Sequence, residues 1–131
     1  MLTKGYKQLL AEANAVVKTV PVEEAKVLRG KDDVQFVDIR DPRELERDGM
    51  IEGAMSAPRG MLEFWVDPES PYYKPALGDG KKTLVLYCAS AWRSALAAKT
   101  LTDMGMTNVS HLEGGFTAWK NAGGAVVKKE K

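Results

Sequence analysis

The chain has 131 residues, and its 19 lysines and arginines nearly balance its 18 aspartates and glutamates. This length suits one domain with a substantial core, and the interspersed, near-neutral charge argues against a nucleic-acid-binding surface. One cysteine excludes an intramolecular disulfide, and one histidine makes a zinc site of cysteines and histidines unfavourable. The sequence has no apolar run of membrane-spanning length and no signal-peptide core at its start, so we expect a cytoplasmic protein.

Helical patterns occupy the beginning of the chain. Apolar residues recur at intervals of three and four between residues 5 and 17, which predicts an amphipathic helix. We favour a helix that packs across its own domain over a partner-binding helix, because any surface helix shows such a stripe. A second helix is predicted from Pro21 to about Gly30, because proline followed by two glutamates is typical of a helix start.

The next segments predict strands with a ligand-binding edge. Residues 34–39 form a short apolar run that is typical of a buried strand, and Asp38 and Arg40 lie at its end. Charged side chains at the carboxyl ends of strands in open α/β sheets lie on the side where ligands bind. A short helix is predicted to begin at Pro42, and a short strand is predicted over residues 54–58.

The middle of the chain is predicted to be irregular. Three prolines between residues 67 and 75 exclude a long helix or a central strand. Long irregular connections in compact domains are often binding loops. Four aromatic residues near this connection therefore either wall the mouth of a pocket or cover the core: Phe64, Trp65, Tyr72 and Tyr73.

The most informative stretch begins with residues 83–87, a short apolar run. Such a run predicts a strand that is buried on both faces of a parallel sheet. From Trp92 to Met104 the apolar spacing changes to that of a helix, and a strand over 109–112 and a helix over 114–121 follow. Strands that alternate with helices indicate an α/β fold whose parallel sheet carries helices on both faces.

Cys88, the only cysteine, lies between the predicted strand and the helix that begins at Trp92. Free backbone N–H groups and the positive end of the helix dipole meet at such a point, and both favour the thiolate form of a cysteine. A lone cysteine is more often a small buried apolar residue. The strand–loop–helix context, with Arg93 five positions further on, indicates a nucleophile instead.

Three motifs resemble the rhodanese family, and they occur in the family's order. Residues 88–94 (Cys-Ala-Ser-Ala-Trp-Arg-Ser) are similar to its active-site loop, whose common pattern is Cys-x-x-Gly-x-Arg-Ser. Residues 37–45 with 49–54 resemble the family's N-terminal signature, and residues 112–119 resemble its C-terminal signature. Any one of these motifs is a weak signal, whereas three in the right order are specific.

The resemblance also implies how the chain is organised. It predicts a rhodanese-like three-layer α/β fold with a central, mostly parallel five-stranded sheet between helices. The expected parts are an N-terminal helical extension (1–19), a rhodanese domain (20–126) and a flexible tail (127–131). We expect neither a cofactor nor a metal.

Sulfur transfer is the activity that the resemblance implies. Cys88 is expected to take the outer sulfur of a donor such as thiosulfate and to pass it, as a persulfide, to cyanide, a thiol or a protein acceptor. The expected substrate-binding residues are Ala89, Ser90, Ala91, Trp92, Arg93 and Arg59. Asp38 and Ser94 are expected to support them. We expect no nucleic-acid or membrane partner.

Two other functions stay open at this point. One is a non-catalytic rhodanese-like module that carries sulfur or docks on a partner protein. The other is that of the related cysteine phosphatases and arsenate reductases, which have five residues between their cysteine and arginine. Only four residues separate Cys88 from Arg93, so sulfur chemistry is favoured over phosphorus or arsenic chemistry.

The loop departs from the family pattern in two ways. Ala91 stands where the family often has glycine, and a positive φ at this position would cost alanine about 1 kcal/mol. Ala89 and Ser90 supply no cation, whereas some members that specialise in thiosulfate have arginine or lysine there. We therefore expect weak thiosulfate binding and a preference for another donor.

The neighbouring charged residues carry alternative interpretations. Asp38 is expected either to form a structural ion pair with Arg40 or to position Arg93, and the two roles are compatible. Arg59 is either an anion ligand in the pocket or a solvated surface arginine. His111, at a strand end and remote in sequence, is expected to be structural.

Overall fold

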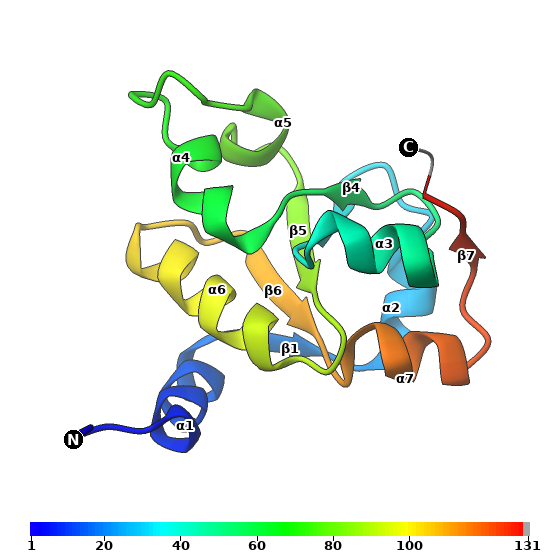
Figure 1. Cartoon of the computed structure of the whole chain (residues 1–131). Helices are drawn as coiled ribbons and strands as arrows, with labels where there is room; N and C mark the ends of the chain where they lie inside the picture. The colour runs from blue at the N-terminus through cyan, green and yellow to red at the C-terminus, as the bar shows by residue number, and fades with distance from the viewer. Residues whose placement is uncertain (130–131) are drawn as a thin grey trace.

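The computed structural model describes residues 1–129 and folds them around a central five-stranded sheet (Figure 1). The strand order is β1 (Lys18–Val20), β6 (Val109–Leu112), β5 (Thr83–Tyr87), β2 (Val34–Asp38) and β4 (Met55–Ser56). All neighbouring strands are parallel, so the predicted parallel α/β sheet is confirmed. β5 is the middle strand, and its carboxyl end lies at the centre of the edge where ligands bind in such sheets.

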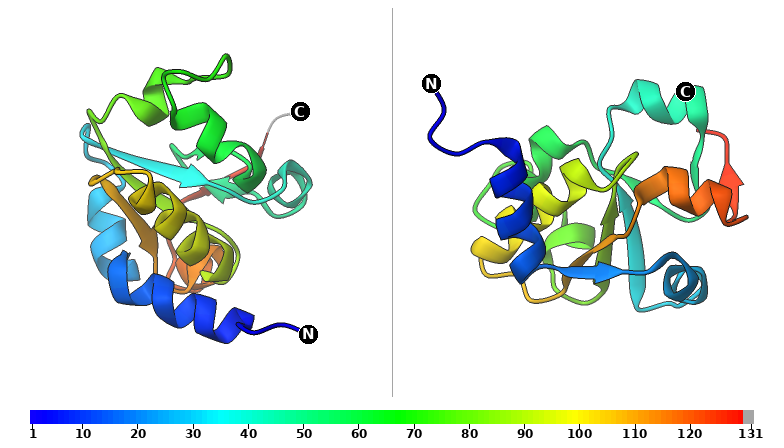
Figure 2. Two further views of the ribbon diagram at one scale, coloured as in Figure 1. Left: turned by 90° about the vertical axis from the view of Figure 1, so that its left-hand side faces the viewer. Right: turned by 90° about the horizontal axis from the view of Figure 1, so that it is seen from below.

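Helices cover both faces of the sheet, as predicted. One face carries the 3-10 helix η1 (Arg59–Met61) and the helices α4 (Leu62–Val66), α5 (Pro75–Gly78) and α6 (Trp92–Asp103). The other face carries α2 (Val22–Leu28) and α7 (Gly115–Asn121), while α3 (Pro42–Asp48) follows the end of β2 (Figure 1). The N-terminal helix α1 (Tyr6–Val16) packs beside α6 (Figure 2).

The alternation of side chains along β5 divides the core into two parts. Leu84 and Leu86 belong to the cluster beneath α6, whereas Val85 and Tyr87 belong to the cluster around Trp119 of α7. These four side chains of β5 and the Trp119 side chain are at most 1% exposed. Because both faces of β5 are covered, the strand is apolar without alternation, which explains the continuous apolar run in the sequence.

Two segments extend the fold beyond the expected domain limits. β3 (Met50–Ile51) pairs antiparallel with β7 (Val126–Val127), so Val127 of the expected tail is part of a small second sheet. Thr19, which was assigned to the N-terminal extension, belongs to β1 and pairs with β6. Strands of two or three residues are too short to show a period, so the sequence did not reveal them. The expected tail also includes residues 130–131, which lie outside the described residues.

The aromatic residues near the proline-rich connection do not line the pockets beside the loop that follows Cys88. None of the four lines the two pockets beside the loop after Cys88. Trp65 packs against the core and has the Lys74 ammonium 4.4 Å above its ring, whereas Phe64 and Tyr72 are exposed. α5 leads into the start of β5, at the opposite end from Cys88 (Figure 1). The alternative that the aromatic residues cover the core holds for Trp65.

Candidate active site

Cys88 directly follows β5, and its side chain is almost fully buried. α6 begins four residues later at Trp92, so the predicted strand–loop–helix arrangement is confirmed. The N-terminus of α7 lies against the same loop. A Cβ atom at Gly115 would lie only 2.5 Å from the Cys88 carbonyl oxygen, and Gly115 also has a φ of +64°. Only glycine allows this close approach.

α7 fixes the orientation of the peptide groups in the loop. The Phe116 N–H donates to the Cys88 carbonyl (2.8 Å), and the Thr117 N–H donates to the Ala89 carbonyl (3.1 Å). In a trans peptide the C=O and the following N–H point in opposite directions, so the N–H groups after these two carbonyls point away from α7. Within residues 1–129, the N–H groups of residues 89–94 have no hydrogen-bond acceptor. They can therefore hold an anion beside Cys88.

Ala91 adopts the left-handed conformation that its position suggested, because the family often has glycine there. Its φ is +76° and its ψ is 0°, and among residues 1–129 it is the one non-glycine residue with a positive φ. Ala91 is also the N-cap of α6, and it provides no side-chain cap. The loop thus holds about 1 kcal/mol of backbone strain, and it leaves the first N–H groups of α6 free for a ligand.

Arg93 closes the loop, but its partner is not Asp38. Its Nη1 and Nη2 donate to the two carboxylate oxygens of Glu44, at 2.8 and 3.0 Å. Hydrogen bonds from Arg93 hold the pKa of Glu44 below its ordinary range, and the pairing also raises the pKa of Arg93. The electrostatic attraction of Cys88 also raises the pKa of Arg93, by less than Glu44 does. Arg93 therefore links α3 to the loop that follows Cys88.

Asp38 instead pairs with Arg40, so the expectation that Asp38 positions Arg93 is wrong. The Arg40 Nη2 lies 2.7 Å from Asp38 Oδ2 and also donates to the Gly49 carbonyl at 2.8 Å. Both side chains are buried, and the Arg40 guanidinium lies 4.3 Å from the centre of the Phe116 ring. This pair ties the end of β2 to the chain after α3 and to α7, which is the structural role that the sequence analysis also considered.

Sequence reasoning missed the role of Glu44. This residue completes a capping box of α3, because its carboxylate accepts from the Asp41 N–H at 3.0 Å while the Asp41 side chain accepts from the Arg43 N–H. The acidic residue three positions after Asp41 is the sequence signal of such a box. It fixes the Glu44 carboxylate at the end of β2, within reach of the neighbouring loop.

Ser94 lies beneath the thiol and connects it to His111. The Cys88 Sγ donates to the Ser94 Oγ at 3.7 Å, and the Ser94 Oγ lies 3.0 Å from the His111 Nδ1. The His111 Nε2 lies 3.1 Å from the Thr19 Oγ1. Sequence reasoning treated His111 as remote. In the sheet, however, β6 pairs with β5, and His111 is the register partner of Leu86.

Two open pockets flank the loop. The first has a volume of about 430 Å³, and Ser90, Ala91 and Trp92 line it together with Asn14 of α1 and His111. The second, of about 280 Å³, lies between Ala89, α7 and Arg40. The Tyr6 ring of α1 packs against Trp92, with 5.2 Å between the ring centres. The N-terminal helix therefore forms a wall of the site, a role that its amphipathic pattern alone did not indicate.

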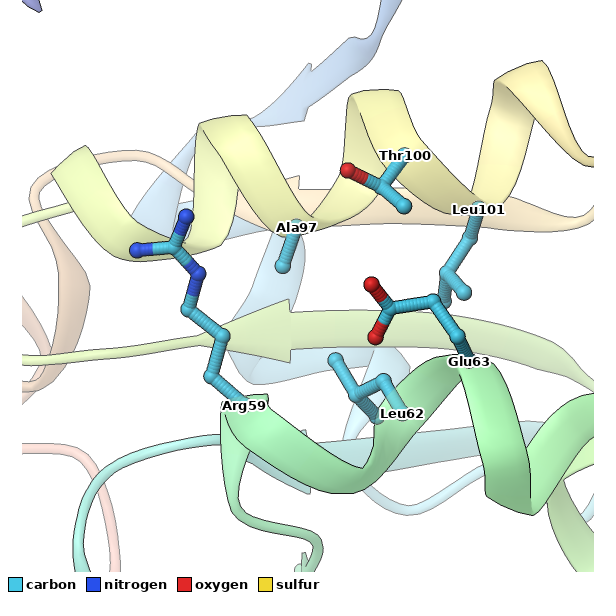
Figure 3. Close-up of a pocket in the computed structure, with 6 residues that line it drawn as sticks. All are labelled: Arg59, Leu62, Glu63, Ala97, Thr100 and Leu101. Atoms are coloured by element: carbon cyan, nitrogen blue, oxygen red, sulfur yellow. The ribbon is translucent and has the colours of Figure 1, made fainter.

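Arg59 lines a different cavity from the two that flank the loop. It lines a cavity of about 50 Å³ with Leu62, Glu63 and three residues of α6, and its side chain extends toward α6 (Figure 3). It lines neither of the two pockets that flank the loop. The structure therefore brings together Cys88, residues 89–92, Arg93 and Ser94, whereas Arg59 lines a separate cavity.

Within residues 1–129, no three histidine, cysteine, aspartate or glutamate side chains are grouped so that they would bind a metal ion. None of the helices in these residues combines the length and the apolar character needed to cross a membrane.

Known proteins are similar to this chain in sequence and in fold. A family model described as a rhodanese-like domain matches residues 21–122. A solved structure from Rhodopseudomonas palustris, described as a protein of unknown function and possible tyrosine phosphatase, is 53% identical with a TM-score of 0.93, and the match covers 97% of each chain.

Curated relatives are more distant. An uncharacterised protein of Synechocystis is 35% identical over 91% of this chain, which spans only 61% of that protein's length. A sulfurtransferase of Allochromatium vinosum is 33% identical, with 79% of this chain and 87% of that protein covered. Because the family model covers most of the chain, the protein belongs to the rhodanese-like domain family.

Proposed function

We propose that the protein is a sulfurtransferase that carries sulfane sulfur on Cys88. The strongest support is the set of unpaired backbone N–H donors in residues 89–94, beside the buried thiol. A persulfide is an anion, and oriented N–H groups stabilise it without a general base. The similarity to a sulfurtransferase of Allochromatium vinosum supports the same chemistry. A reduced thiol is required, which agrees with the cytoplasmic setting expected from the sequence.

The proposed reaction has two half-reactions. In the first, the Cys88 thiolate attacks the outer sulfur of a donor such as thiosulfate; a sulfur–sulfur bond forms on Cys88, and sulfite leaves with the electron pair of the broken bond. In the second, cyanide or a thiolate attacks the outer sulfur of the persulfide, and the Cys88 thiolate leaves. Such covalent catalysis gives ping-pong kinetics. The acceptor is a small thiophile or the thiol of a partner protein.

Within this reaction, Arg93 mainly shapes the loop. Its guanidinium donates two hydrogen bonds to the Glu44 carboxylate, so its position is set by α3 rather than by the substrate. Its charge still contributes to the binding of an anionic donor, because Arg93 lies at the end of the same loop, in the first turn of α6. With Arg59 absent from the lining of the two pockets beside the loop and no cation at positions 89 and 90, we expect binding of thiosulfate to depend on Arg93 and the N–H groups and to be weak.

A phosphatase is the second candidate, because a structure that is 53% identical is described as a possible tyrosine phosphatase. The loop argues against it. Only four residues separate Cys88 from Arg93, so the cradle of N–H groups is smaller than the five-residue loop expected for a tetrahedral oxyanion. A sulfur carrier without turnover of its own is the third candidate.

One experiment separates the three candidates. The intact protein is incubated with thiosulfate and weighed, and its turnover is then assayed with thiosulfate plus cyanide and with p-nitrophenyl phosphate. We expect a mass increase of about 32 Da, the mass of one sulfur atom, and formation of thiocyanate. A carrier would gain the mass without turnover, whereas a phosphatase would hydrolyse the ester and gain no mass.

The first prediction concerns Cys88→Ser. This variant should neither gain sulfur nor form thiocyanate, because the chain has no other thiol. Circular dichroism should show an unchanged fold, since serine differs from cysteine by one atom. Measurable thiocyanate formation by the folded variant would exclude Cys88 as the sulfur carrier.

A further inference from the structure

A line of hydrogen-bonded side chains connects the catalytic thiol to the pocket beside α1. It consists of Cys88, Ser94, His111 and Thr19, with successive distances of 3.7, 3.0 and 3.1 Å. Cys88, Ser94 and His111 are at most 2% exposed. Thr19 is half-buried and, with His111, lines the pocket of about 430 Å³. The line thus begins at a thiol that water barely reaches and ends at an open surface.

We propose that Ser94, His111 and Thr19 form a proton relay that takes the thiol proton of Cys88 to this pocket and returns it. The proposal rests on Cys88 as the nucleophile of the proposed function, and it adds a role for three residues that the sulfur chemistry itself does not require. All three act as positioning residues, because none of them contacts the sulfur that is transferred.

The relay balances without a change in redox state. In the thiol form, Cys88 donates to Ser94 Oγ, Ser94 donates to His111 Nδ1, and His111 Nε2–H donates to Thr19 Oγ1. When the thiol ionises, each group passes one proton along the line, and Thr19 releases one proton to water in the pocket. Every donor then points the other way. The serine and the threonine keep their protonation, while the imidazole changes from the Nε2–H to the Nδ1–H tautomer.

A neutral imidazole is the form that such a relay needs. It has one donor and one acceptor nitrogen, whereas an imidazolium ion has two donors and cannot accept. Burial lowers the pKa of His111, which keeps the ring neutral at physiological pH. The contacts of both ring nitrogens suit this role, because hydroxyl groups, which donate and accept equally well, face Nδ1 and Nε2.

Charged groups lie near Cys88 and near Thr19, the two ends of the relay, but none of them is the group to which Cys88 donates its hydrogen bond. Arg93 faces Cys88 from α6 and is neutralised by Glu44 of α3. Glu113 lines the pocket at the Thr19 end. On the opposite side of the loop, the second pocket contains Lys120 and Asp48, together with Arg40, which is paired with Asp38. Ser94 is the side chain to which Cys88 donates its proton.

The test follows the protonation of Cys88 directly. The chain has one cysteine, so the ultraviolet absorbance of the thiolate and the rate of alkylation by iodoacetamide both report on this residue. Both are measured against pH for the wild type, Ser94→Ala and Thr19→Val. At neutral pH we expect alkylation to slow about tenfold in Ser94→Ala and about threefold in Thr19→Val, with matching shifts of the absorbance titration to higher pH. Thr19→Ser should restore the wild-type profile.

Ser110→Ala is the matched control. Ser110 is also buried on β6, but its hydroxyl donates to the Leu84 carbonyl at 3.1 Å and does not join the line. It should lower stability without moving either pH profile. Wild-type profiles in Thr19→Val would overturn the relay, even if Ser94→Ala shifts, because the effect would then end at Ser94. Neither readout uses a sulfur donor, so a relay in a protein that forms no persulfide would overturn the proposed function alone.

Discussion

The Asp38–Arg40 pair at the end of β2 and the Glu44–Arg93 pair beside the loop after β5 differ in burial. The Asp38–Arg40 pair is fully buried, with side chains that are 0% and 1% exposed. The Glu44–Arg93 pair joins α3 to the loop that follows Cys88, with side chains that are 21% and 37% exposed. Both pairs use two hydrogen bonds between guanidinium and carboxylate, so their geometry is similar and their surroundings are not.

This difference separates stability from catalysis. Removal of one member of a buried pair leaves an uncompensated charge in a low-dielectric core, which is strongly destabilising. The same change in a partly exposed pair is softened by water. The buried pair should therefore determine whether the protein folds, and the partly exposed pair should determine whether its loop is in the active shape.

Removal of the buried carboxylate should have the largest effect on stability. Asp38→Asn leaves Arg40 charged and unpaired, and we expect the free energy of unfolding to fall by about 3–5 kcal/mol. Urea denaturation measures this change. Asp48→Asn is the matched control, because Asp48 pairs with Arg47 at the surface and the same substitution should cost at most about 1 kcal/mol. Equal losses in the two variants would contradict the assigned importance of burial.

Disruption of the partly exposed pair should mainly affect catalysis. Arg93→Lys keeps the charge but not the fork that binds Glu44. We expect kcat for thiocyanate formation to fall about ten- to a hundredfold, because the loop shifts, while stability falls by only about 1 kcal/mol. Steady-state kinetics and urea denaturation provide the two values. An increase of KM with kcat unchanged would instead assign Arg93 to donor binding alone.

A double-mutant cycle identifies the partner of Arg93. Glu44→Gln should reproduce most of the loss of kcat, and Arg93→Lys with Glu44→Gln together should be less than additive, because each variant alone already breaks the pair. Asp38→Asn with Arg93→Lys should show additive effects on ln kcat, provided that the double variant folds. Additive effects with Glu44→Gln and coupling with Asp38→Asn would instead identify Asp38 as the partner of Arg93, as the sequence suggested.

The sequence predicted the strands and helices around Cys88 but not the partner of Arg93. The apolar run 83–87 and the helical period from Trp92 are local signals, and the structure has both elements at those positions. Which acid meets Arg93 depends on how α3 is placed against the loop, which no local period reports. Asp38 was the expected partner because it ends β2, the strand beside β5. In the structure, Asp38 is already paired with Arg40, two positions later in the chain.

The hydrogen-bonded line through His111 was missed for a related reason. Its members are separated by up to 92 residues in sequence and meet only because β1, β6 and β5 are neighbours. A parallel α/β pattern does not fix the order of its strands, so the sequence could not place His111 beside Cys88. Ala91 was different. A positive φ at this residue could be expected from the loop motif, because the family often has glycine at this position and glycine readily adopts a positive φ.

Acid should selectively remove the contribution of the partly exposed pair. The Glu44 pKa is lowered, mainly by its hydrogen bonds with Arg93, so the folded state binds this proton less readily than the unfolded state. The stabilisation is therefore present above the ordinary glutamate pKa and is lost as the pH falls through the lowered value. The stability difference between wild type and Glu44→Gln should shrink as the pH falls from neutral into the range of carboxyl titration. Urea denaturation across this range checks it, and a constant difference would be evidence against the pairing.

The smallest expected effect concerns the strain that the partly exposed pair maintains in the loop. Ala91→Gly removes the steric cost of φ +76°, although glycine also gives the unfolded chain more freedom. We expect a net stabilisation of about 0.5 kcal/mol in urea denaturation. Ala89→Gly is the matched control, because Ala89 has no positive φ and the same substitution should destabilise the protein. If Glu44–Arg93 holds the loop against this strain, Ala91→Gly should also recover part of the kcat that Arg93→Lys loses. A gain of stability without any recovery would mean that the strain and the ion pair act independently.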